Sequence, residues 1–207
     1  GRHADNKLSI QEFMVVPKLR TYKENLRAAT EVYHKLKSDL HKKYGSGATN
    51  VGDEGGFAPL KIRKTTEALD MLRKAIRETG YYKKVEIAID CAASEFYQNG
   101  RYNIDGRKLT TEQLIEFYKK LISRYPIISI EDPFHQDDFE AFTELRNQTS
   151  IQVVGDDLTV THKDRIKAAI KEKSCNCLLL KVNQVGTLTE SLDAAKIAQK
   201  AGWKVMV

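Results

Sequence analysis

The 207-residue sequence predicts an α/β protein built around a parallel sheet, either an α/β barrel or a doubly wound sheet. Short apolar runs rich in β-branched residues, typical of buried strands, recur along the chain. They cover residues 10–16, 85–90, 126–131, 151–156, 177–182 and 203–207. Helical patterns separate most of these runs, and crossovers this short favour parallel neighbours. No linker or low-complexity segment interrupts the series, so a single domain is expected.

The predicted helices carry recognisable end signals. Thr110 and Thr187 are each followed three residues later by Gln or Glu, which is the spacing of a capping box at a helix start. Gly80 and Gly202 each follow a helical pattern and are expected to end it. A longer amphipathic helix is predicted over residues 22–44.

Composition narrows the class of protein. No run of 18 or more apolar residues occurs, so no membrane span is predicted, and the first residues lack the layout of a signal peptide. The three cysteines are odd in number and lie in or beside apolar runs, which favours reduced thiols and a cytoplasmic location. The net charge of +6 is spread over helices that also carry Asp and Glu, so it indicates solvated helix faces and not nucleic-acid binding.

Ionisable residues stand at or near the ends of four predicted strands: Asp90, Glu131, Asp156 and Lys181. The carboxyl ends of parallel strands lie on one face, where barrel enzymes build their active sites. Any one of these acids alone is better explained as a helix cap or a water-facing residue. Four such groups on successive strands predict a shared cavity.

Three converging carboxylates repel one another and call for a cation. Because hard oxygen ligands suit Mg²⁺, we predict a magnesium site formed by Asp90, Glu131 and Asp156. The adjacent acids Asp132 and Asp157 are better candidates for making turns or supporting this site.

Lys181 is the candidate base. A free lysine titrates near ~10.4, but a divalent ion in a low-dielectric pocket disfavours its charged form and allows it to accept a proton. The matching task is removal of a proton α to a carboxylate. The alternative is a structural ion pair between Lys181 and one of the acids.

The segment NVGDEGGFAP, residues 50–59, places Asp53 and Glu54 among glycines. An acid on such a loop can close over a site, and Glu54 could then protonate a departing hydroxyl while Lys181 takes the proton. The chemistry would be an elimination. A solvated turn before a helix is the alternative, and loop composition does not choose between them.

These residues lie in segments that resemble the enolase family, in order, over essentially the whole chain. The segments are HADNKLSIQEFM (3–14), NVGDEGGFAP (50–59), IDCAASEFY (89–97), SIEDPFHQDD (129–138), VVGDDLTVT (153–161) and LLLKVNQVGTLTES (178–191). GDEGG, SIEDP and LLKVNQVGT are together highly specific. The resemblance implies a TIM-type (β/α)8 barrel of the enolase kind, of which six of eight strands are expected here.

The resemblance also implies a function and the residues that perform it. The reaction would be the reversible, Mg²⁺-dependent dehydration of 2-phosphoglycerate to phosphoenolpyruvate in glycolysis and gluconeogenesis, a hydro-lyase activity. Lys181 matches the base and Glu54 the acid that assists loss of the 3-hydroxyl. The positions that match metal ligands are Asp90, Glu131 and Asp156. The positions that match substrate-binding residues are His3, Glu12, Glu131 and Asp156.

Residues 1–207 match an incomplete C-terminal barrel domain, without the family's N-terminal α+β domain and last barrel strand. This piece alone is therefore expected to be inactive, and the full protein to be a cytoplasmic homodimer or octamer. The family motifs HAGN and EDPF-x-x-DDW read HADN here and have Phe139 in place of Trp. Two alternatives remain: another proton-abstracting enzyme of the enolase superfamily, and a truncated, non-catalytic binding protein.

Overall fold

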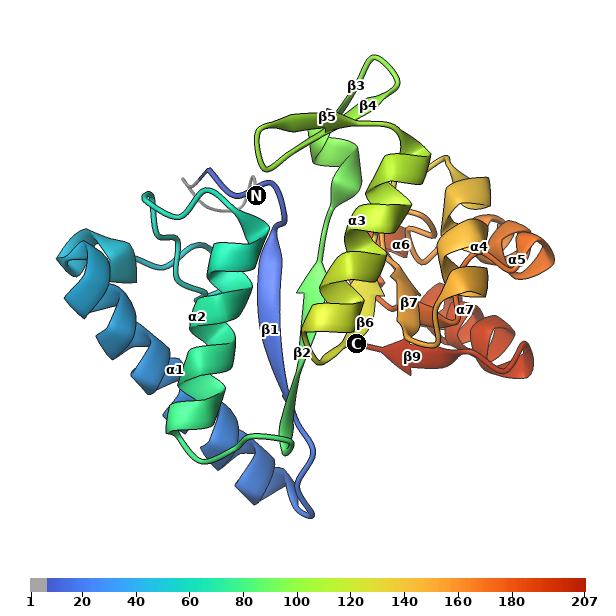
Figure 1. Cartoon of the computed structure of the whole chain (residues 1–207). Coiled ribbons are helices and arrows are strands. Elements are labelled where there is room, and N and C mark those ends of the chain that lie inside the picture. Colours follow the sequence, from blue (N-terminus) through green and yellow to red (C-terminus); the bar gives the residue numbers. More distant parts are fainter. Residues whose placement is uncertain (1–6) are drawn as a thin grey trace.

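The computed structural model describes residues 7–207, which form a curled six-stranded sheet with helices outside it (Figure 1). The strands, in their order across the sheet, are β1 (Glu12–Pro17), β2 (Val85–Asp90), β6 (Ile127–Glu131), β7 (Gln152–Gly155), β8 (Cys177–Leu179) and β9 (Lys204–Met206). From β2 to β9 all neighbours are parallel. The predicted partial barrel, with its predicted strands, is confirmed.

The first strand runs the other way: β1 pairs with β2 in antiparallel fashion, so the expectation of parallel neighbours is wrong for this pair. The reason lies in the connection. Two helices, α1 (Tyr22–Tyr44) and α2 (Thr65–Glu78), pack against each other beside β1 (Figure 1). A single helix between two strands returns the chain to the end of the sheet where the first strand began, so the second strand runs parallel to the first. A pair of helices leaves the chain at the end where the first strand finished, so the second strand runs antiparallel.

The remaining helices are α3 (Thr111–Arg124), α4 (Phe139–Gln148), α5 (Lys163–Glu172), α6 (Val182–Val185) and α7 (Leu188–Lys200). Apart from the short α6, they cover the outer face of the sheet (Figure 1). The strand side chains Ile89, Ile130, Val153 and Leu178 are fully buried in one core with the apolar sides of these helices. This core holds the strand ends in place.

The predicted helix ends are confirmed. The Thr110 side chain forms a complete capping box with Gln113, and Thr187 accepts the backbone N–H of Glu190 at 3.2 Å. Gly80 and Gly202 follow α2 and α7 with φ of 80° and 78°, a left-handed conformation that glycine adopts without strain.

A small three-stranded sheet between β2 and α3 was not predicted. It consists of β3 (Tyr97–Gln98), β4 (Arg101–Ile104) and β5 (Arg107–Leu109). These strands are too short and too polar for an alternation pattern to reveal them. The fully buried Tyr102 joins this hairpin to the loop after β6, because its hydroxyl accepts the backbone N–H of His135 at 3.0 Å.

The strand over residues 177–182 ends earlier than predicted. β8 stops at Leu179, Lys181 lies two residues beyond it, and Val182 begins α6. The backbone N–H of Lys181 donates to the Thr161 side chain instead of to a neighbouring strand. Lys181 is therefore held by a turn and not by the sheet.

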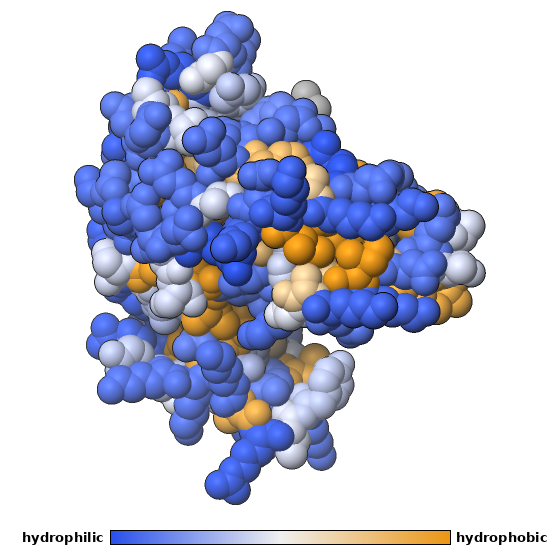
Figure 2. Space-filling view, turned by 90° about the vertical axis from the view of Figure 1, so that its right-hand side faces the viewer, coloured by the Kyte–Doolittle hydropathy of each residue, from blue (hydrophilic) through white to orange (hydrophobic). Residues whose placement is uncertain are grey.

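Seen from the side of α5 and α7 (Figure 2), the surface is mostly hydrophilic, with apolar groups gathered in a central band. The exposed large apolar side chains of α6 and α7 are Val182, Leu188 and Leu192. None of the helices in the described part of the chain has the length and apolar composition needed to cross a bilayer.

Candidate functional site

Four acidic side chains share one face of the sheet at the end where the parallel strands finish. Glu12 is paired with Asp90 across β1 and β2, and Asp90 is paired with Glu131 across β2 and β6. Glu131 is paired with Val154 of β7, and Asp156 comes directly after that strand, close enough for its charge to act on Asp90 and Glu131. Because β1 is antiparallel, its first residue and not its last lies at this end.

Asp90 is buried, and its two carboxylate oxygens accept hydrogen bonds of 2.9 Å from the Ala92 N–H and the Gln11 side-chain amide. Burial raises the pKa of Asp90 to about 6, and the negative charges of Asp156 and Asp157 add to this effect. The two hydrogen bonds oppose the rise, since they favour the charged form. The hydrogen bonds thus orient the Asp90 carboxyl group, while burial and the neighbouring negative charges disfavour its ionised form.

Glu131 is the most perturbed of these acids. Burial, together with the charges of Asp90, Asp132 and Asp156, raises its pKa to about 9, while Lys181 opposes the rise. A neutral carboxyl group at neutral pH is the expected result of crowding buried like charges. A bound cation is the usual means of keeping such a group ionised.

Lys181 lies beside Asp156, with its Nζ 2.5 Å from the Asp156 Oδ2. The lysine side chain is 43% exposed, and the aspartate side chain only 11%. Burial alone lowers the pKa of Lys181, but Asp156, Glu131 and Asp90 together more than offset this and raise it. The contact fits both interpretations of Lys181, a base beside the acids and a structural ion pair.

Asp132 supports the turn after β7. Its Oδ1 accepts the backbone N–H groups of Asp156 at 3.1 Å and Leu158 at 3.4 Å, and its Oδ2 accepts that of Asp157 at 2.6 Å. The buried Asp132 therefore fixes the backbone that carries Asp156. This is the supporting role suggested by the sequence.

Within the described residues, the acidic group that lies close enough together to hold an ion overlaps the predicted one only at Asp156. Carboxylate oxygens of Asp132, Asp156 and Asp157 lie within 4.8 Å of one another, close enough to hold an ion together. Sequence reasoning missed this group because it treated the two adjacent acids as turn formers. Both oxygens of Asp132 already accept backbone N–H groups, so fewer of its lone pairs remain for a metal.

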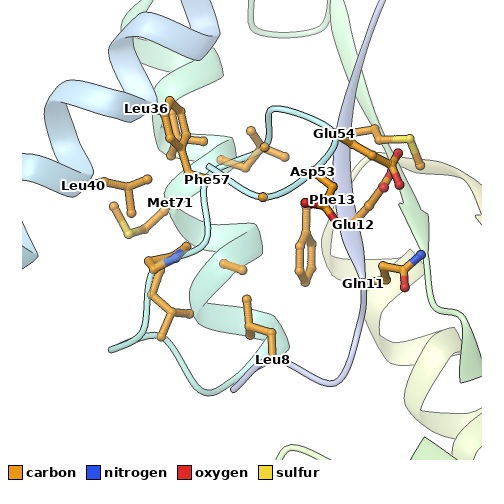
Figure 3. Close-up of a pocket in the computed structure, with 17 residues that line it drawn as sticks. Leu8, Gln11, Glu12, Phe13, Leu36, Leu40, Asp53, Glu54, Phe57 and Met71 are labelled. Carbon is orange, nitrogen blue, oxygen red and sulfur yellow. The ribbon is translucent and has the colours of Figure 1, made fainter. Parts of the chain in front are cut away.

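The glycine-rich loop at residues 50–59 is a small hairpin docked on α1. Within it, Gly52 N–H donates to the Gly56 carbonyl and Ala58 N–H to the Asn50 carbonyl, both at 2.9 Å. Tyr33 of α1 stacks on Phe57, with ring centroids 4.3 Å apart, and donates its hydroxyl to the Gly55 carbonyl at 2.9 Å. These contacts hold the loop so that Glu54 lies toward β1 (Figure 3).

The loop covers one side of a pocket of about 270 Å³ that lies between β1, α1 and α2 (Figure 3). Leu8, Leu40 and Met71 contribute to its apolar lining, and Glu12 and Glu54 lie together at one side. Burial, a hydrogen bond to Glu54 and the charges of Glu54 and Asp90 raise the pKa of Glu12 to about 8. Glu12 is therefore largely protonated at neutral pH and is hydrogen-bonded to Glu54.

The candidate acid and base flank the acidic residues. Glu54 is next to β1 at one edge of the sheet, and Lys181 follows β8 toward the other edge. Asp90, Glu131 and Asp156 stand at the ends of the strands between them. The predicted substrate contact His3 lies outside the described residues.

A family model supplies the assignment. The model for the enolase C-terminal TIM barrel domain matches residues 1–207, the full length of the sequence. This match agrees with the curled, largely parallel sheet and the helices outside it. The chain belongs to the enolase C-terminal TIM barrel domain family.

Proposed function

We propose that the protein carrying this chain is an enolase, which catalyses the reversible dehydration of 2-phosphoglycerate to phosphoenolpyruvate. The arrangement of Lys181 and the Glu12–Glu54 pair on opposite sides of three buried carboxyl groups carries this proposal. An elimination needs a base for the carbon acid and an acid for the leaving hydroxyl, held apart on two sides of the substrate. The motif resemblance supports the same substrate.

We further propose Mg²⁺ as the cofactor, held by Asp90, Glu131 and Asp156. These buried oxygen donors fit a hard cation, and burial together with neighbouring negative charge raises the pKa values of Asp90 and Glu131. When bound, Mg²⁺ supplies positive charge that offsets these carboxylates and the negative charge that develops on the substrate carboxylate. The overlapping group with Asp132 and Asp157 is the competing ligand set.

The residues of the chain would divide the reaction between them. Lys181 would accept the proton from C2 of the substrate through Nζ. This requires its neutral form, whereas the nearby carboxylates raise its pKa, so a cation bound to those carboxylates would have to offset their effect. The electron pair left on C2 forms the double bond to C3 as the C3–oxygen bond breaks. Glu54 gives the proton of its hydrogen bond with Glu12 to the departing hydroxyl, which leaves as water. One proton is taken up and one is released, so the step balances.

Cytoplasmic location, a glycolytic and gluconeogenic role, and assembly as a homodimer or octamer are further proposals that rest on the motif resemblance. Conversion of 2-phosphoglycerate by the full protein in the presence of Mg²⁺, followed as absorbance of the enol product, tests the proposed activity. Turnover would support it. A protein that folds and binds Mg²⁺ but produces no phosphoenolpyruvate would refute it.

Mg²⁺ binding should strengthen as the pH rises from about 6 to about 9. Since the raised pKa of Glu131 is about 9 and that of Asp90 about 6, protons compete with the cation for these oxygens below those values. Binding at neutral pH should therefore release protons. Calorimetry in two buffers of different ionisation enthalpy measures this release, and binding that is independent of pH would contradict the proposed ligands.

The same measurement separates the two possible ligand sets. Glu131→Gln should weaken Mg²⁺ binding if the proposed set holds the ion, whereas Asp157→Asn should leave it nearly unchanged. The opposite pattern would assign the ion to the group of Asp132, Asp156 and Asp157. Asp156→Ala should weaken binding in either case, because Asp156 belongs to both sets.

A further inference from the structure

A closed ring of hydrogen bonds joins Asp156 and Lys181 through two uncharged residues, Gln184 and Thr161. The Gln184 amide nitrogen donates to Asp156 Oδ1 at 2.7 Å, and Lys181 Nζ donates to Oδ2 at 2.5 Å. The Thr161 hydroxyl donates to Gln184 Oε1 at 2.7 Å and accepts the backbone N–H of Lys181 at 3.0 Å. The ring thus includes both carboxylate oxygens of Asp156, and both the backbone N–H and the side-chain Nζ of Lys181.

The chemistry of the groups fixes the direction of each bond in this ring. Only the nitrogen of the Gln184 amide can donate to a carboxylate, so its oxygen is left to accept. Because the Thr161 hydroxyl oxygen accepts the Lys181 N–H, its own hydrogen is available to donate to the side-chain oxygen of Gln184. Rotating the side chain of Asp156, Gln184 or Thr161 would break two bonds of the ring.

Backbone strain accompanies this arrangement. Val160 and Thr161 have φ of 42° and 54°, and two consecutive β-branched residues in the left-handed region are unusual because their side chains crowd the backbone there. They end the turn that begins at Asp156, whose carbonyl accepts the Val160 N–H at 2.7 Å. The result is that the hydroxyl of Thr161, a residue that is only 1% exposed, faces β8 and the start of α6. Strain of this kind persists where a site requires it.

The short helix α6 places the glutamine. The Gln184 N–H donates to the Lys181 carbonyl at 3.0 Å, so base and glutamine are on the same turn. Gly186 ends α6 with φ of 84° and donates its N–H to the Val182 carbonyl at 2.8 Å. Since other residues rarely adopt this conformation, Gly186 keeps α6 to a single turn and Gln184 half-buried beside Asp156.

We propose that Gln184 and Thr161 are positioning residues for the site, and that they hold the Asp156 carboxylate in one orientation. Gln184 occupies Oδ1, so Oδ2 is the oxygen presented on the Lys181 side. Thr161 in turn fixes Gln184 and the backbone of Lys181. The inference rests on the proposed function, in which Asp156 is a metal ligand and Lys181 the base. Neither positioning residue adds charge to the site.

Gln184→Leu removes the bond to Asp156 while keeping a side chain of similar size. Loss of a residue that orients a metal ligand typically weakens metal binding by about 10- to 100-fold, and we expect a loss of this size for Mg²⁺ measured alone by calorimetry. The midpoint of urea unfolding should stay near that of the parent protein. The matched control Gln199→Leu, on the exposed side of α7, should change neither quantity.

Thr161 supplies the second arm of the test. Thr161→Val keeps the shape but loses the hydroxyl, and should weaken Mg²⁺ binding, whereas Thr161→Ser retains the hydroxyl and should restore it. The double variant Gln184→Leu with Thr161→Val should lose no more than Gln184→Leu alone, because both act through one chain of bonds.

The proposal would be overturned if Gln184→Leu bound Mg²⁺ with an affinity within twofold of the parent protein. It would also be overturned if Thr161→Ser and Thr161→Val lost affinity equally. A third contrary result would be weaker Mg²⁺ binding found only in variants whose urea-unfolding midpoint is also lowered. A parent protein that binds no Mg²⁺ would overturn it too. Failure of the proposed function is recognised separately, because Mg²⁺ binding is measured without turnover. Weakened binding in Gln184→Leu with no 2-phosphoglycerate conversion by the parent would refute only the enolase activity.

Discussion

Replacing Lys181 with alanine should abolish exchange of the C2 hydrogen of 2-phosphoglycerate with solvent, and dehydration with it. The Nζ group beside Asp156 is the proposed acceptor of that proton. General-base catalysis contributes about 10²- to 10⁴-fold to a rate, so a loss within or above this range is expected. The measurement is the rate of deuterium incorporation at C2 in D₂O, followed by NMR in the full protein.

A control is needed because Lys181→Ala also removes the ion pair with Asp156. Exchange should therefore be measured at saturating Mg²⁺, which separates loss of the base from altered metal binding. Lys196→Ala removes an exposed lysine of α7, which pairs with its helix neighbour Asp193, and should leave exchange unchanged. Full exchange activity in Lys181→Ala would leave the structural ion pair as the remaining explanation for this lysine.

Glu54→Gln should block dehydration while leaving C2 exchange largely in place. The amide cannot give a proton to the departing hydroxyl, but Lys181 is untouched on the far side of the acidic strands. Loss of a general acid lowers the rate of its step by about 10²- to 10⁴-fold. Phosphoenolpyruvate formation and deuterium incorporation, measured on the same samples, give the two rates.

Asp53 provides the comparison for Glu54, since it is the adjacent acid on the same loop. Asp53→Asn should retain most of the dehydration activity, because the hydrogen bond to Glu12 involves Glu54. If Asp53→Asn blocked dehydration and Glu54→Gln did not, the acid would be Asp53. Equal loss of exchange in Glu54→Gln and Lys181→Ala would contradict the division of acid and base roles.

The strands and helices were largely predictable because their signals are local. Buried strands such as residues 85–90 need consecutive apolar residues, and capped helices such as α3 need particular residues at their ends. The small sheet over residues 97–109 was not predictable from local patterns, because its short strands are stabilised by tertiary contacts such as those of the buried Tyr102. The direction of β1 was not predicted, because it depends on how two helices pack.

The sequence by itself determined the fold family and the acids and lysine available to the site, because strand-end positions and family motifs are written in consecutive residues. Only the tertiary structure decided which of these groups meet: Glu12 with Glu54, Lys181 with Asp156, and Gln184 with Asp156. These contacts join residues up to tens of positions apart. They depend on strand register, the antiparallel β1 and two strained turn residues, none of which a local pattern encodes.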